Sequence, residues 1–215
     1  DVRQAERARA QAQSRKRVLR QVRDARDKLT SATGTKRSFE TELMRLYARN
    51  KLSAALAVVL LAVGTGWLAG WITNPVMGAL GAGVVLIAHG FVVLLCHVFL
   101  KQKPDAVDLK SWRIRFVMAE FVLGLAWVVA LSLVMQTDVP EANTFLLVSM
   151  LIVVAFSAML SSTLPGAVLA SSLPVTITVM AFFLVVRGPS GALLATMAGM
   201  ALVFFSVIST KLYET

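Results

Sequence analysis

Residues 52–100 decide the fold: LSAALAVVLLAVGTGWLAGWI (52–72), then Thr73-Asn74-Pro75, then VMGALGAGVVLIAHGFVVLLCHVFL (76–100). Neither run contains a Lys, Arg, Asp or Glu residue. Each is long enough for the hydrocarbon core of a bilayer, because a helix needs roughly 20 apolar residues to cross it. The three residues between them favour a turn. We therefore expect two antiparallel transmembrane helices.

The same composition continues toward the C-terminus. A third apolar run covers 116–136, and after Glu141 the one charged residue before Lys211 is Arg187. Turn-forming residues at 161–166 and 187–191 divide that long stretch. The expected spans are 52–72, 76–100, 116–136, 143–162, 165–186 and 190–209. The sequence thus predicts an all-α, polytopic membrane protein, with a six-helix transmembrane domain over 52–215.

The composition excludes several other classes of protein. The chain is 57% hydrophobic and 16% charged, with a mean hydropathy of +0.71, whereas soluble domains are about 45–50% apolar and about 25% charged. A single cysteine excludes a disulfide scaffold. The net charge of +10 is uneven, since residues 1–51 hold 15 of the 22 basic residues. That segment is therefore treated as a separate region.

The basic residues also predict the orientation. With six spans both termini lie on one side, and that side receives residues 1–51, the 101–115 loop and Lys211, which together hold 21 of the 22 basic residues. Basic loops stay in the cytoplasm, so we expect both termini on the cytoplasmic side of the membrane. The first apolar run has the full length of a span, so we expect no signal peptide.

The basic front segment, residues 1–51, is predicted to form cytoplasmic helices with a break at 31–35. Val18, Val22, Ala25 and Leu29 have heptad spacing, which favours a short coiled-coil dimer. A second helix over about 36–50 carries one apolar face, formed by Phe39, Leu43, Leu46 and Tyr47. Three readings remain open: a dimerisation arm, docking on anionic lipid, or a solvated face that sets topology. No nucleic-acid module is present, so no nucleic-acid partner is expected.

Ionisable residues inside a span are costly and therefore candidates for function. His97 and Glu120 are each expected about one turn inside the cytoplasmic boundary, on consecutive helices. Glu120 would pair with His97 or, as we favour, with Arg113 or Arg115 in the adjoining loop. Trp112 lies in the same loop, and we expect these loop residues to anchor the domain at the membrane surface.

His89 is expected near the middle of the bilayer, at a depth similar to that of Trp127. It could relay protons, bind haem or copper, or donate a hydrogen bond within the bundle, and we favour the last. His89 and His97 are weak metal-ligand candidates, because they are some 12 Å apart along one helix and cannot ligate one haem. We therefore expect no metal and no cofactor.

Pro174 interrupts the fifth span directly after Ser171-Ser172, a pattern typical of a helix hinge. Small residues recur on three spans, where they would allow close helix contact: Gly64, Gly66 and Gly70, then Gly78, Gly81 and Gly83, and finally Ala195 and Gly199. No nucleophile stands with a base and no carboxylate pair lies in the membrane, so we expect no enzyme activity from this chain.

Two motifs, one in the loop before the third span and one within that span, suggest a family. The runs SWRIRF (111–116) and EFVLGLAW (120–127), followed by three polar-poor helices, resemble the six-helix membrane input region of bacterial sensor histidine kinases and of GGDEF/EAL signalling proteins. The resemblance covers residues 52–215. It implies a sensor of lipophilic or membrane-state signals in the bacterial inner membrane, in two-component or related signal transduction. Such a sensor relays through its sixth helix to a dimeric cytoplasmic output.

Two other classes of function remain open. A small transporter or channel would use His89 and Glu120 as its coupling residues. An assembly or scaffold subunit would instead bind partner membrane helices through its glycine-rich faces.

Overall fold

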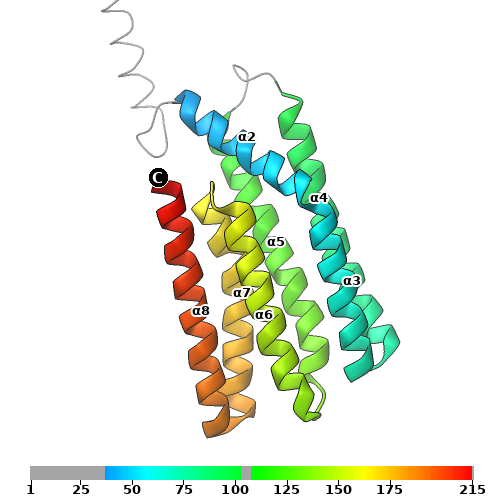
Figure 1. Cartoon of the computed structure of the whole chain (residues 1–215). Coiled ribbons are helices and arrows are strands. Elements are labelled where there is room, and N and C mark those ends of the chain that lie inside the picture. Colours follow the sequence, from blue (N-terminus) through cyan, green and yellow to red (C-terminus); the bar gives the residue numbers. More distant parts are fainter. Residues whose placement is uncertain (1–36, 103–107, 215) are drawn as a thin grey trace, which may run out of the picture. The chain divides into compact units, whose positions relative to one another are not determined.

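The computed structural model describes residues 37–102 and 108–214, and these form helices and no strand. The helices are α2 (Arg37–Ser53), α3 (Ala55–Ile72), α4 (Pro75–Leu100), α5 (Leu109–Met135), α6 (Pro140–Ser161), α7 (Pro165–Val186) and α8 (Gly188–Glu214). Helices α3 to α8 are each long and apolar enough to cross a membrane (Figure 1). The prediction of an all-α membrane protein with six spanning helices is confirmed.

Turn chemistry sets several of the helix starts. Pro75, Pro140 and Pro165 each stand at the beginning of a helix, where proline is favoured because its missing N–H has no helical partner there. The Asn74 side chain accepts a hydrogen bond of 3.0 Å from the Met77 N–H. Helix α5 starts at Leu109, well before the predicted span start at residue 116.

The chain divides into two compact units, Asp1–Leu43 and Met44–Thr215. Helix α2 begins in the first unit, and its residues 44–53 belong to the second. The second unit therefore starts before the predicted domain boundary at residue 52. The predicted heptad at 18–29 and the break at 31–35 lie outside the described residues.

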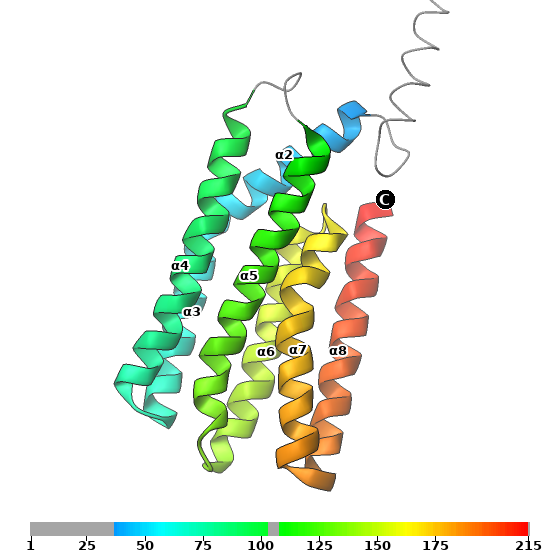
Figure 2. The same ribbon diagram turned by 180° about the vertical axis from the view of Figure 1, so that it is seen from behind.

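Helix α5 is the central element of the second unit. It packs mainly against α4 and α7, and its contact with α6, the next helix in the chain, is much smaller. Helix α7 contacts α5, α6 and α8, and α3 forms a hairpin with α4. Figures 1 and 2 show α5 between the α3–α4 hairpin and the α6–α8 group. We call the end where α4 finishes and α5 starts the basic end; it lies at the top of both figures.

Several glycines allow close helix contact, Gly78 among those predicted to do so and Gly124 in addition to them. A Cβ atom on Gly124 of α5 would lie 2.5 Å from the Ser171 carbonyl oxygen of α7, so only glycine permits this approach. A Cβ on Gly78 would likewise overlap the backbone of Gly66 and Gly70 in the α3–α4 hairpin. Gly64 and Gly83 face open space, however, so their predicted role in helix contact within this chain is wrong.

Pro174 lies within a continuous α7. The Ser171 and Ser172 hydroxyls donate to the carbonyls of Ala167 and Val168, whereas a proline at 174 removes the bond to the carbonyl of Ala170. The sequence suggests that the two serines satisfy the carbonyl that the proline frees, and that expectation is wrong, because their acceptors are other carbonyls. The role of Pro174 as a hinge stays a prediction.

Candidate functional site: a buried ion pair beside an aromatic cluster

Glu120 of α5 is the centre of a buried polar contact between α2 and α5. Its Oε1 atom lies 2.6 Å from Lys51 Nζ and also accepts a 2.6 Å hydrogen bond from the Tyr47 hydroxyl. The side chains of Lys51 and Glu120 are 5% and 0% exposed. The Lys51 ammonium also lies 5.7 Å from the centre of the Tyr47 ring. We call Tyr47, Lys51 and Glu120 the anchor site.

Helix periodicity brings two of these residues to one face of α2. Met44, Tyr47, Ala48 and Lys51 are all buried, and their spacing of three, four and seven residues is that of one helix face. The predicted apolar face differed, since it grouped Tyr47 with Leu46, whose side chain is exposed. At about 100° per residue, Leu46 points about 150° away from the centre of this buried face, so it is exposed when the face is buried.

Helix α2 continues almost directly into α3. The Ala54 N–H donates to the Asn50 carbonyl and the Val58 N–H to the Ala54 carbonyl, so the chain bends at Ala54 with helical bonds on both sides. A shift of residues 44–53 would therefore act on α3 through continuous backbone.

Four aromatic rings pack beside the anchor site, and we call Tyr47, Phe99, Trp112 and Phe116 the aromatic cluster. Phe116 lies 4.9 Å from Tyr47, 5.2 Å from Phe99 and 5.7 Å from Trp112, between ring centres. Phe99 lies 5.3 Å from Trp112. Tilted rings at these separations are favourable beyond the area they bury. The cluster joins α2, α4 and α5 at the basic end.

The electrostatics of the anchor site favour a charged pair with a neutral tyrosine. Burial, followed by the negative charge of Glu120, raises the pKa of the Tyr47 hydroxyl well above its usual value of 10.0. Tyr47 is therefore a hydrogen-bond donor to Glu120 at neutral pH. Removal of either charge would leave the other buried without compensation, which is far more costly than the loss of an exposed pair.

The structure corrects the expected partners of Glu120. Arg115 instead stacks on the Trp112 ring, with 4.9 Å between the guanidinium carbon and the ring centre. His97 is exposed. Neither His97 nor Arg113 nor Arg115 has a carboxylate partner within 4.0 Å among the described residues.

The predicted depth of Glu120 was also wrong, and the early start of α5 is the reason. Phe99 contacts both Trp112 and Phe116, so residue 120 is level with about residue 93 of α4. His97 therefore lies about one turn nearer the basic end than Glu120, and His89 about one turn further from it.

His89 is buried on α4, and both of its ring nitrogens lack a hydrogen-bond partner in the described residues. The Oε2 atom of Glu120 is buried and also lacks a donor. Trp127 is buried within α5. No described group of three or more His, Cys, Asp or Glu residues could hold a metal ion.

The opposite end of the bundle carries a different kind of contact. Arg187 Nη2 donates to the Thr137 carbonyl at 3.4 Å, and Arg187 Nη1 lies 3.9 Å from Asp138 Oδ1. The Asp138 side chain is 99% exposed. This pair joins the α5–α6 loop to the α7–α8 turn, with the arginine side chain 22% exposed and the carboxylate almost fully exposed.

Sequence reasoning missed Lys51 and Tyr47 as site residues. It assigned Lys51 to the cationic segment and Tyr47 to an apolar face. Their spacing of four residues, with Met44 and Ala48 on the same face, is the signal that would have placed them together.

Comparisons with protein-family models, curated proteins and solved structures each find no match to the chain.

Proposed function

We propose that the chain is the membrane-embedded input domain of a signalling protein in the bacterial inner membrane. It passes a lipophilic or membrane-state signal through α8 to a cytoplasmic output. The observation that carries this proposal is that the bundle holds α2 and α8 through different kinds of contact. Helix α2 is held by the buried anchor site, whereas residues 195–199 of α8 pack through small apolar side chains.

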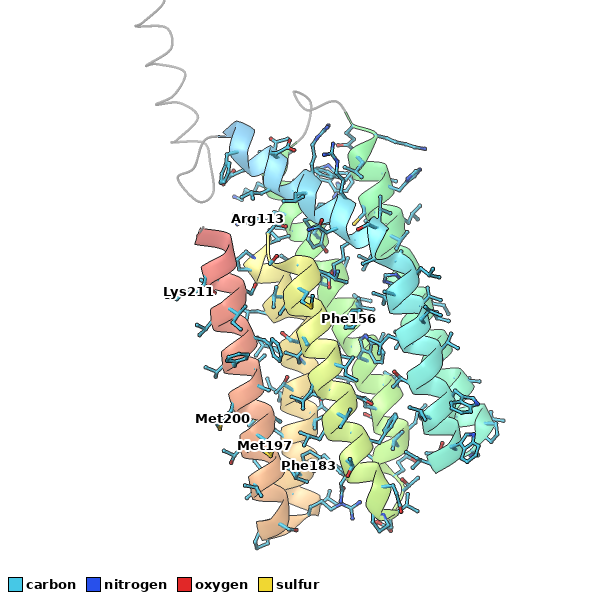
Figure 3. All side chains as sticks on the ribbon, in the orientation of Figure 1. Arg113, Phe156, Phe183, Met197, Met200 and Lys211 are labelled. Atoms are coloured by element: carbon cyan, nitrogen blue, oxygen red, sulfur yellow. The ribbon has the colours of Figure 1, made fainter. Side chains whose placement is uncertain are left out.

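Helix α8 packs on its neighbours through small side chains. Ala195 and Ala198 are buried, and Gly199 faces the Met180 side chain of α7. On the outer side, Met200 is 67% exposed and projects away from the bundle (Figure 3). Because apolar contacts are not directional, α8 can rotate or slide against α7 without breaking a hydrogen bond at these residues. Such small helix shifts are a common form of signal transmission.

The orientation rests on the distribution of charge. The basic end carries Lys101, Lys110, Arg113 and Arg115, and α8 finishes at the same end with Lys211 (Figure 1). Loops rich in Lys and Arg remain in the cytoplasm. The basic end is therefore assigned to the cytoplasm, where an output domain or partner protein would receive the movement of α8.

A cross-linking experiment tests the relay. Cys96 is the single cysteine, so Cys96→Ala gives a cysteine-free background. The pair Met180→Cys and Gly199→Cys reports on the α7–α8 contact, and Gly81→Cys with Ala130→Cys is the matched control at the α4–α5 contact. Each purified variant is reconstituted in bilayers of thin, medium and thick hydrocarbon core, and its rate of reaction with a short bifunctional thiol reagent is measured.

The relay predicts that the α7–α8 rate changes several-fold with bilayer thickness while the α4–α5 rate stays constant. Equal behaviour of the two pairs, constant or changing, would contradict it. A bilayer-dependent output from a reporter enzyme fused after Thr215 is the matching functional measurement. Its loss in a variant cross-linked between α7 and α8 is the expected result.

A second candidate function has one observation in its favour. His89 and the Oε2 atom of Glu120 are buried polar groups that find no hydrogen-bond partner in the described part of the chain, on adjacent helices and about one turn apart in depth. Such groups mark ion or proton pathways in transporters. Proton flux in proteoliposomes that is abolished by His89→Ala would favour this function over the input domain. No flux above that of empty vesicles would exclude it.

A further inference from the structure

We propose that Arg115, held against Trp112, binds the headgroup phosphate of an anionic phospholipid at the basic end of the bundle. This is a binding site on the bilayer-facing surface of α5. The inference goes beyond the proposed function and holds whether or not the domain carries a signal.

The first argument is that the protein fixes the position of this guanidinium group. Trp112 is buried, with Phe99 and Phe116 packed against it. Arg115 lies over that ring, with its guanidinium carbon 4.9 Å from the ring centre. Stacking on an aromatic ring leaves the planar N–H donors of arginine free at their edge. The group is thus ordered before any ligand arrives, which lowers the entropic cost of binding.

The second argument is the charge of the surroundings. Glu120, the nearest carboxylate along α5, is occupied by Lys51 and Tyr47 on the far side of the aromatic cluster. Asp108, at the start of α5, accepts a hydrogen bond from Ser111, which holds the pKa of that carboxyl below its usual value. Among the described residues no carboxylate lies within 4.0 Å of Arg115. Its positive charge is therefore available to an external anion.

The third argument is the depth of Arg115 along the bundle, which favours a lipid phosphate over a soluble anion as the ligand. Ile114 and Met118, which flank Arg115 in sequence, are each 55% exposed, as expected for side chains that face acyl chains. Because Phe99 is level with Trp112 and Phe116, Arg115 is level with about residue 98 of α4. That is less than one turn from Lys101, where the apolar run of α4 ends. A lipid phosphate reaches this level while its chains cover Ile114 and Met118.

Arginine suits this ligand chemically. Its planar donors bind two phosphate oxygens at once, and a long side chain near a helix end extends its charged group toward the interface. Attraction of a basic residue to an anionic membrane surface is worth about 1 kcal/mol, which corresponds to about a fivefold change in affinity.

The test compares two variants that remove the same charge from the same turn. Arg115→Gln removes the proposed ligand contact, and Arg113→Gln is the control, because residues two apart point about 200° apart around a helix. The protein is purified in mild detergent and titrated with a fluorescent phosphatidylglycerol and, separately, with a fluorescent phosphatidylcholine. Thermal unfolding of each variant checks that the fold is retained.

We expect Arg115→Gln to weaken phosphatidylglycerol binding about fivefold, Arg113→Gln to leave it unchanged, and neither to alter phosphatidylcholine binding. Equal weakening by both variants would overturn the site in favour of diffuse attraction to the basic end, and no weakening by Arg115→Gln would overturn it outright. Inorganic phosphate is added as a competitor. Displacement of the lipid by millimolar phosphate would overturn the assignment to a headgroup, because the lipid gains from its chains and the free ion does not.

Discussion

The two ends of the bundle each hold an ion pair, and the pairs differ in almost every physical respect. Lys51 and Glu120 are 2.6 Å apart with both side chains buried. Arg187 and Asp138 are 3.9 Å apart, and Asp138 is almost fully exposed. A buried pair that loses one partner leaves an uncompensated charge, whereas an exposed pair that breaks is replaced by water.

The comparison indicates which contacts are essential to the stability of the bundle. At the basic end, the chain that precedes the first span is tied to the third span by charge, hydrogen bond and ring packing together. At the opposite end, the loops are short and their contact is close to neutral in energy. Movement that leaves the fold intact is therefore expected at α8 and at the Arg187 end, and not at α2.

The largest effect is expected when one member of the buried pair is removed. Lys51→Met leaves Glu120 buried without its counter-charge, and we expect a loss of about 3–5 kcal/mol in the free energy of unfolding. The measurement is equilibrium unfolding in mixed detergent micelles. Lys101→Met, which removes an exposed charge at the same end, is the matched control and should unfold like the original protein.

Replacement of the whole anchor site should restore stability. The triple variant Lys51→Met, Glu120→Leu and Tyr47→Phe removes both charges and the hydroxyl that would lose its acceptor. Apolar replacements of buried ion pairs are often neutral or stabilising, so we expect stability near that of the original. A triple variant as unstable as Lys51→Met would show that the packing around the site, and not the charge balance, sets its contribution.

A smaller loss is expected for Tyr47→Phe. The ring and its contact with Phe116 remain, and only the hydrogen bond to a charged acceptor is lost, which is worth about 1.5–3 kcal/mol. The coupling is measured with a double-mutant cycle, since Tyr47→Phe should cost little in a Glu120→Leu background. An equal loss in both backgrounds would mean that the hydroxyl does not act through Glu120.

The six spans could be predicted from the sequence because the bilayer imposes a length and a composition that few other folds share. The prolines at 75, 140 and 165 and the turn residues around them marked the boundaries between spans. The start of α5 could not be read in this way. Residues 109–115 are polar enough to resemble a loop, yet they continue the helix and place Glu120 deeper than expected.

The contacts of the anchor site could not be predicted from the sequence, for a different reason. Glu120 and Tyr47 lie 73 positions apart in the chain, and a lysine at the edge of a span looks the same whether it faces water or a carboxylate. Glu120 was correctly singled out as a costly intramembrane charge, but its partner depended on the rotation of α2. That rotation is set by the burial of Met44, Tyr47 and Ala48 against the bundle.

Alkaline pH offers a further test of the difference between the two ends, because ionisation of Tyr47 changes the stability of the basic end. Burial and the charge of Glu120 raise the pKa of this hydroxyl in the folded protein above its usual value of 10.0. The folded state therefore keeps its proton when the unfolded state has lost it, and the stabilisation present below pH 10 declines as the pH rises. The expected slope is about 1.4 kcal/mol per pH unit above 10.

The control for this slope is Tyr47→Phe, which has no hydroxyl to titrate. The difference in unfolding free energy between the original protein and the variant, measured from pH 8 to pH 11, isolates Tyr47 from the lysines that ionise in the same range. The difference should be constant below pH 10 and shrink above it. A constant difference up to pH 11 would contradict a buried, neutral tyrosine at the anchor site.

The smallest effect is expected for Arg187→Gln at the opposite end. The charge that it removes is paired with an exposed carboxylate at 3.9 Å, and its other contacts are a 3.4 Å hydrogen bond to the Thr137 carbonyl and a 5.5 Å approach to the Phe182 ring. Water can replace each of these contacts, so unfolding in micelles should match that of the original protein. Asp138→Asn, which removes the other partner, should give the same result. A loss as large as that of Tyr47→Phe in either variant would erase the difference between the ends, because an exposed pair would then hold the loops as firmly as the anchor site holds α2.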